Sequence, residues 1–215
     1  MPGTLIVNAR LVNEGREFDG DIRFANGRIT HVGGQLTAQP GDQVIEAGGR
    51  WVLPGMVDDQ VHFREPGLTH KGDIATESAA AVAGGLTTFM DMPNTNPPTL
   101  NAQALQAKYD AAAGRAWGNF GFYLGASNDN LDDVRTLDPK TAPGIKVFMG
   151  ASTGNMLVDN PDTLDAIFRE APTPIITHCE DTPTINANLA LFKVKYGDDI
   201  PVECHPDIRS REACI

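Results

Sequence analysis

The sequence predicts an α/β protein in which a small β module precedes the first units of an incomplete barrel of parallel strands. In residues 1–50, short alternating segments are separated by Gly and Asn, which is typical of strands joined by tight turns. From Trp51 onward, strand-like segments alternate with helix-like segments, the pattern of βα units around a parallel sheet. We therefore expect two domains, residues 1–50 and residues 51–215.

The second region is expected to contain five strand-then-helix units. Asp73 is a candidate N-cap of the first helix, and the Gly pair at 84–85 is its stop signal. Because a closed barrel of this type has eight strands, the chain is expected to hold about five units of eight and to be truncated. The strand segments are GMVDDQVHF, LTTFMDMP, NFGFYLGAS, GIKVFMGAS and PIITHCED.

Composition excludes several classes of protein. The chain has 41% hydrophobic and 21% charged residues and no apolar run near the roughly 20 residues of a membrane helix, so no membrane association is expected. Its net charge of −11 disfavours binding to nucleic acid. Three scattered cysteines indicate neither a disulfide framework nor a zinc knuckle, and the N-terminus does not resemble a signal peptide. A cytoplasmic location is expected.

Four polar residues stand where predicted strands end, which is where parallel α/β folds carry their chemistry: His62, Asn94, Lys146 and His178. Histidines at two strand ends could share a metal site, because neutral imidazole is a good zinc ligand. An ammonium cannot bind a cation. A buried lysine that reacts with carbon dioxide becomes an anionic carbamate, whose two oxygens could bridge two metals.

Five segments together give the chain a resemblance to the dihydroorotases, metal-dependent cyclic amidases of the amidohydrolase superfamily that act in pyrimidine biosynthesis. The resemblance runs from about Trp51 to the last residue. It implies a partial (β/α) TIM-like hydrolase barrel, with residues 1–50 forming part of a side β-sandwich. The segments, in order, are GMVDDQVHFREPG, MPNTNPPT, GIKVFMGASTG, THCED and HPDIRSREA.

The resemblance implies a role for each candidate residue. His62 and His178 would bind one or two zinc ions, bridged by Lys146 as a carbamate, and Arg64 and Asn94 would grip the carboxylate of the substrate. The implied reaction is the reversible hydrolysis of (S)-dihydroorotate to N-carbamoyl-L-aspartate. A further histidine and the catalytic aspartate would come from the sixth and eighth strands, so residues 1–215 alone are expected to be inactive. A homo-oligomer is expected, with aspartate transcarbamoylase as a candidate partner.

Gln60 departs from the family pattern, which has a histidine at this position. An amide oxygen is a weaker zinc donor than imidazole. Gln60 is therefore a candidate poor ligand, a candidate hydrogen-bonding group beside the metal, or a sign of lost function. The sequence does not choose among these.

The sequence also allows other functions for the chain and other roles for these residues. A hydantoinase or allantoinase shares the strand-end histidines, although its neutral substrate needs no clamp formed by Arg64 and Asn94. A non-catalytic dihydroorotase-like subunit would explain Gln60 but not an intact Lys146. Taken singly, a strand histidine often packs in a core and a strand lysine often reaches solvent. Arg64 could pair with Glu65 or Asp91, and Asn94 could initiate a turn.

Overall fold

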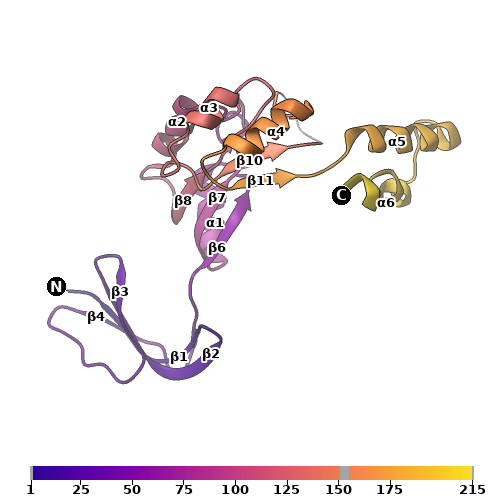
Figure 1. Cartoon of the computed structure of the whole chain (residues 1–215). Helices are drawn as coiled ribbons and strands as arrows, with labels where there is room; N and C mark the ends of the chain where they lie inside the picture. Colours follow the sequence, from indigo (N-terminus) through magenta and orange to yellow (C-terminus); the bar gives the residue numbers. More distant parts are fainter. Residues whose placement is uncertain (1, 151–154, 215) are drawn as a thin grey trace. The chain divides into compact units, whose positions relative to one another are not determined.

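The computed structural model describes residues 2–150 and 155–214 (Figure 1). The chain divides into two compact units, residues 1–55 and 56–215. The expected boundary lay at 50/51. The boundary lies later in the chain because Trp51–Val52 (β5) pairs with Arg10 and Leu11 of β1 and so belongs to the first unit.

The first unit is a five-stranded sheet built around β1 (Thr4–Asn13). β1 and β2 (Arg16–Ala25) are antiparallel, as are β2 and β3 (Arg28–Val32), whereas β4 (Gln43–Glu46) and β5 run parallel to β1.

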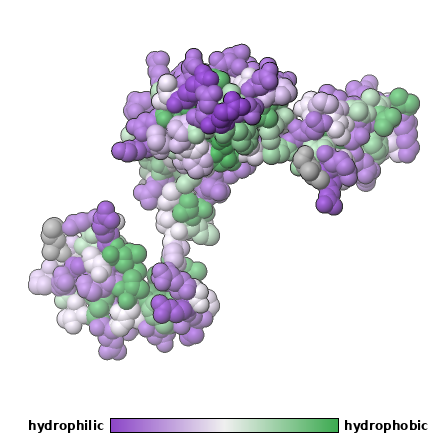
Figure 2. Space-filling model, viewed as in Figure 1, coloured by the Kyte–Doolittle hydropathy of each residue, from purple (hydrophilic) through white to green (hydrophobic). Residues whose placement is uncertain are grey.

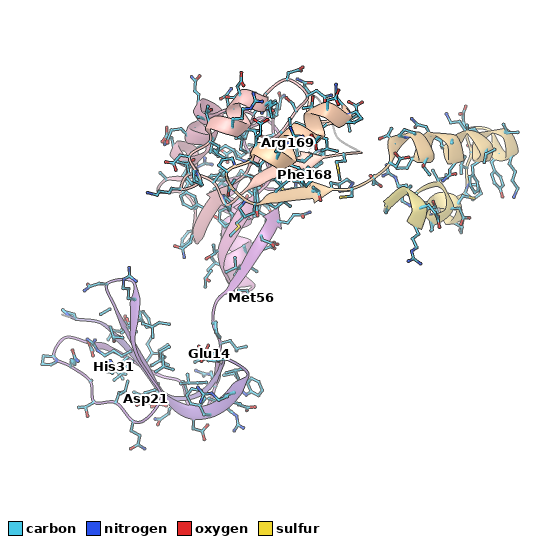
Figure 3. All side chains as sticks on the ribbon, in the orientation of Figure 1. Glu14, Asp21, His31, Met56, Phe168 and Arg169 are labelled. Carbon is cyan, nitrogen blue, oxygen red and sulfur yellow. The ribbon has the colours of Figure 1, made fainter. Side chains whose placement is uncertain are left out.

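Two tight turns join the first three strands of this sheet. The turn between β1 and β2 is formed by Glu14 and Gly15, and Glu14 is labelled in Figure 3. The turn between β2 and β3 is formed by Asn26 and Gly27. In both turns the two residues have positive φ, between 50° and 71°, as a two-residue hairpin turn requires.

Apolar surface remains on the first unit, where it is visible in green in Figure 2. Its buried cluster is small and consists of Ala9, Leu11 and Ala47, with Ile6, Phe18, Ile22 and Val52 packed against it. Ile29 is 63% exposed and Leu53 is 58% exposed. A hollow of about 340 Å³ lies among these apolar side chains. These side chains form one apolar face, rather than the single scattered apolar residues that are common on protein surfaces.

The second unit begins with Met56, labelled in Figure 3, and consists of five βα units, as expected. Both the first helix's N-cap and its end agree with the prediction, since the Asp73 side chain accepts from the Thr76 N–H and the helix stops at Gly84. The elements are β6 (Met56–Val61), α1 (Ile74–Ala83), β7 (Leu86–Asp91), α2 (Ala102–Ala112), β8 (Asn119–Phe122), β9 (Leu124–Gly125), α3 (Leu131–Thr136), β10 (Ile145–Phe148), α4 (Pro161–Glu170), β11 (Ile175–His178) and α5 (Thr182–Tyr196).

All strands of this unit are parallel and follow one another in chain order, β6–β7–β8 and then β9–β10–β11. The third predicted strand is divided at Tyr123, whose N–H donates to Asp91 O, while the next N–H, that of Leu124, donates to Gly144 O. The strand thus changes its hydrogen-bonded neighbour from β7 to β10 at this point. The result is the first part of a parallel barrel.

Helices α1 to α4 pack on one face of these strands. Strand residues Phe89, Phe122, Leu124, Ile145 and Val147 form a buried cluster with helix residues. Successive strand residues point to opposite faces, so the residues between them lie on the face away from the helices. The helix residues of the cluster include Ile74, Leu105, Val134 and Ile167.

After β11 come α5, a short 3-10 helix (Val202–Cys204), α6 (His205–Ile208) and a last 3-10 turn (Arg211–Cys214). Within the segment HPDIRSREACI, α6 ends at Ile208 and the last 3-10 turn follows. The Asp181 N–H donates to Ala213 O, which ties this segment to the end of β11. Among the described residues, no helix combines the length and the apolar character needed to cross a membrane.

Candidate functional site

The candidate metal ligands lie on the face of the strands opposite the helices. Val61 and Phe63 belong to the buried cluster, whereas Gln60 and His62, on either side of Val61, are exposed. The alternation of side chains along β10 places Lys146 opposite Ile145 and Val147. His178 is the register partner of Phe148, which is on the same side as Lys146. The last four residues of the segment GIKVFMGASTG, 151–154, lie outside the described residues.

His62 is held by Asn94. Its Nδ1 lies 2.9 Å from Asn94 Oδ1. An amide oxygen only accepts, so Nδ1 carries the proton and Nε2 keeps its lone pair. Burial lowers the pKa of His62 below its usual value, the charge of Arg64 lowers it further, and the bond to Asn94 acts in the opposite direction. A neutral imidazole with one fixed N–H is the form in which histidine binds a metal.

Lys146 lies in the middle of β10 and is 2% exposed. Its Nζ lies 4.9 Å from the centroid of the Phe148 ring, and it forms no hydrogen bond or ion pair with another described residue. Burial lowers the pKa of this lysine, because the charged form loses its hydration. The charge of Lys146 also contributes to the lowered pKa of His62, which indicates that the two side chains are near each other.

The ring of His178 is held by Glu180 through Nε2, whereas the ring of His62 is held through Nδ1. Nε2 lies 2.9 Å from Glu180 Oε2, and the other oxygen of Glu180 bonds to Arg209. Arg209 is the main reason that the pKa of Glu180 is below its ordinary value. The ring centroid of His178 lies 6.2 Å from that of Phe148. Nδ1 is therefore the nitrogen of His178 that is left for another partner.

Arg64 and Asn94 follow the ends of the neighbouring strands β6 and β7. Neither acidic residue suggested as a partner of Arg64 is bound to it, since Glu65 pairs with Arg115 at 2.7 Å and Asp91 pairs with Lys108 at 2.6 Å. Arg64 has φ +66°, a left-handed conformation that is uncommon outside Gly and Asn. The charge of Arg64 acts on His62, which Asn94 contacts. Asn94 thus contacts the His62 imidazole directly, whereas Arg64 acts on it through its charge.

The amidohydrolase family model matches residues 51–207. This chain belongs to the amidohydrolase family. Its partial barrel is therefore the first part of the TIM-like barrel of this family, as the sequence predicted.

Named relatives include two kinds of cyclic amidase. The dihydroorotase of Methanosarcina acetivorans is 36% identical over 213 residues, 97% of this chain and 44% of that protein. The L-hydantoinase of Paenarthrobacter aurescens is 31% identical over 201 residues, 91% of this chain and 44% of that protein. The solved structure of the L-hydantoinase (dihydropyrimidinase) from Arthrobacter aurescens has a TM-score of 0.89 at 29% identity, covering 98% of this chain and 47% of that one. The chain spans less than half the length of these relatives.

The described donor set of this amidohydrolase chain would fit a metal with Lys146 as a further donor. Within residues 2–150 and 155–214, no group of three His, Cys, Asp or Glu side chains is placed to hold a cation. His62 and His178 supply two neutral imidazoles on one face, and neither carries the negative charge that would balance a divalent ion. A carbamate on the buried Lys146 would supply that charge, and Gln60 could add a neutral oxygen.

Four residues of the site were not singled out from the sequence as functional: Asp91, Lys108, Glu180 and Arg209. Asp91 is the last residue of β7 and directly precedes the MPNTNPPT segment, so its place at a strand end was a usable signal. Glu180 follows His178 at a spacing of two. Lys108 lies inside a helix and Arg209 follows one, and nothing in the local pattern distinguishes them from solvent-exposed basic residues.

Proposed function

We propose that this chain is the N-terminal part of a dihydroorotase, which hydrolyses (S)-dihydroorotate reversibly to N-carbamoyl-L-aspartate in pyrimidine biosynthesis. One observation carries the choice of substrate. A side-chain amide, Asn94, contacts the His62 imidazole, and a guanidinium, Arg64, follows His62 by two residues and carries a charge that acts on the same ring. A planar fork of donors with a neutral amide beside it suits a carboxylate, which dihydroorotate carries on its ring.

Zinc would be held by His62 through Nε2, by His178 through Nδ1, and by Lys146 as a carbamate. In forming the carbamate, neutral Nζ bonds to the carbon of carbon dioxide and releases one proton to water. The lowered pKa of Lys146 supports this step, because it raises the fraction of neutral amine. When bound, zinc lowers the pKa of water and polarises the ring carbonyl.

The residues of this chain would position the substrate for that chemistry. Arg64 would bind the carboxylate through two parallel hydrogen bonds, and Asn94 would donate from Nδ2, which its bond to His62 leaves free. Asn94 would then join the substrate and the His62 ring through its two amide atoms. Proton transfer to the departing ring nitrogen is assigned to an aspartate of the eighth strand, beyond these 215 residues.

Gln60 would leave one metal site weaker than the other. Its side chain is exposed on the same face as His62, and its own N–H is held by Asp58 Oδ1 at 3.0 Å. The backbone of Gln60 is thus fixed, while the neutral amide offers a poorer donor than the histidine that the family has there. We propose two metal sites of unequal affinity, or one occupied site.

A hydantoinase is the second candidate, because the L-hydantoinase structure is similar over 98% of this chain. Its substrate ring carries no required carboxylate. A non-catalytic subunit that supports aspartate transcarbamoylase is a third reading, favoured by Gln60 and disfavoured by the intact Lys146 and His178.

Dihydroorotate and 5,6-dihydrouracil separate the first two candidates, because they share a ring and differ by the carboxylate. In the complete protein, we expect kcat/KM to favour dihydroorotate. Arg64→Met should lower kcat/KM for dihydroorotate by about 30- to 1000-fold, on the order of 2–4 kcal/mol, and leave dihydrouracil nearly unchanged. Arg16→Met, in the exposed β1–β2 hairpin, is the control. Equal turnover of the two rings by the unmutated protein would exclude the clamp.

A further inference from the structure

A charged pair is buried beneath the strand ends that carry the site. Lys108 on α2 is 2% exposed and Asp91 at the end of β7 is fully buried. Lys108 Nζ lies 2.6 Å from Asp91 Oδ2 and 3.1 Å from Met92 O, and 4.8 Å from the centroid of the Phe122 ring. These three partners of the ammonium group are all buried.

Stability alone is a weak reason for such a pair. Removing two charges from water is costly, and apolar residues of similar size often stabilise a core equally well. The cost is visible at Lys108, whose pKa is lowered by burial even though Asp91 acts to raise it. A second purpose is suggested by what the rest of Asp91 contacts.

The other oxygen of Asp91 reaches the residue after His62. Asp91 Oδ1 accepts the N–H of Phe63 at 2.9 Å. On the other side of His62, Val61 O accepts the N–H of Met92 at 3.0 Å. The two residues that flank His62 are thus bonded to Asp91, the last residue of β7, and to Met92, which follows it. The backbone of His62 has little freedom to shift or rotate between these two bonds.

The same pair also fixes the partner of the His62 ring. Asn94 follows Asp91 by three positions, and the carbonyl of Met92, between them, is held by Lys108. One ammonium group therefore holds both the carboxylate that anchors the His62 backbone and the chain that leads to Asn94. The hydrogen bond between His62 Nδ1 and Asn94 Oδ1, at 2.9 Å, connects the segment that contains His62 with the segment that leads to Asn94.

We propose that Lys108 and Asp91 are positioning residues, which set the orientation and the protonated nitrogen of His62 and the placement of Asn94 from the outer layer of the barrel. The role of His62 as a metal ligand rests on the proposed function, whereas the connection from Lys108 to the His62 ring is a property of the fold.

The test replaces Lys108 by Met in the complete protein and observes the His62 ring by nitrogen NMR without metal. The unmutated ring should be in the Nδ1–H form, and K108M should convert it to a mixture of the two forms. The affinity for zinc, measured by competition with a chelator, should fall about 10- to 100-fold. Lys140→Met, at an exposed lysine, is the matched control and should change neither the form of the His62 ring nor the affinity for zinc.

Lys108→Met leaves Asp91 buried without a partner, so it can unfold the barrel. The double variant D91N/K108M removes both charges and keeps an oxygen for the Phe63 N–H. It should fold and still show the mixed His62 ring. An unchanged ring and unchanged zinc affinity in either folded variant would overturn the proposal.

Should neither variant fold, the unmutated protein still decides the matter. The Phe63 and Met92 amides should exchange with solvent as slowly as core strand amides, and fast exchange would contradict the proposal. The proposed function is tested separately. If the unmutated complete protein does not turn over dihydroorotate, that function is excluded. A change of the His62 ring in K108M would still support the positioning role.

Discussion

At the scale of the residue, Lys146 is the side chain on which the proposed chemistry depends. Its place in GIKVFMG suggested a buried lysine, and the structure confirms the burial, with only 2% of the residue exposed. The sequence could not supply the reason for its altered pKa. That reason is burial of the amine, which depends on neighbouring strands rather than on local pattern.

We predict that Lys146 is carbamylated in the complete protein. Labelled bicarbonate should give a carbamate carbon signal that is absent in Lys146→Ala and present in the control Lys140→Ala. The Ala variant should lose bridging of two metals, and short carboxylates should partly restore it by supplying the missing oxygens. Diffraction density for a bare amine beside two bound metals would contradict this.

Gln60 gives a second prediction at this scale. Gln60→His should raise the occupancy or affinity of the weaker metal site, because imidazole is a stronger zinc donor than an amide oxygen. Stoichiometry measured by metal analysis after dialysis, and affinity measured by chelator competition, report the change. Gln43→His, on an exposed strand of the first unit, controls for an added surface histidine. Identical stoichiometry and affinity would show that Gln60 is not near the metal.

At the scale of the element, local sequence signals predicted where a helix begins and ends, whereas contacts between elements far apart in the sequence were not predicted. The cap at Asp73 and the stop at Gly84 follow from neighbours in sequence, and both are as predicted. The Lys108–Asp91 pair could not be predicted, because it depends on how α2 lies against the end of β7. The end of the first domain was also missed, since Trp51–Val52 reads as the start of a new unit and instead pairs with β1.

The first unit carries an acid-sensitive connection between β2 and the segment before β4. Arg23 bonds to Asp42 at 2.7 Å, and Asp42 also accepts the N–H groups of Gly3 and Gln39. The bond from Arg23 is the largest of the effects that hold the pKa of Asp42 well below its ordinary value. A carboxyl whose pKa is lower when folded stabilises the protein above its unfolded pKa, and this contribution is lost as pH falls through the folded value.

We therefore expect the unfolding temperature of the complete protein to fall with pH below about 4, where unfolded carboxyls begin to bind protons. In Asp42→Asn the temperature at neutral pH should be lower and its decrease with acid smaller. Asp198→Asn, at an exposed site without this network, should follow the unmutated curve. Parallel curves for D42N and the unmutated protein would show that Asp42 does not set the acid response.

At the scale of the whole molecule, the parallel sheet has two edges. In residues 56–150 and 155–214, β6 pairs with β7 alone and β11 pairs with β10 alone. The strands that would close a barrel of eight are not among them. Backbone groups along the outer sides of β6 and β11 therefore have no strand partner among these residues. Exposed edges of this kind promote association between chains.

The last prediction concerns the polypeptide of residues 1–215 expressed by itself. It should be poorly soluble and should not open the dihydroorotate ring, because the unpaired edges favour aggregation and the sixth-strand histidine and eighth-strand aspartate are not supplied. Adding the C-terminal half of the complete protein in trans should raise both solubility and turnover. Thermal unfolding with zinc present and a ring-opening assay measure the two properties. A soluble fragment with a cooperative transition and full activity would contradict the need for the remaining strands.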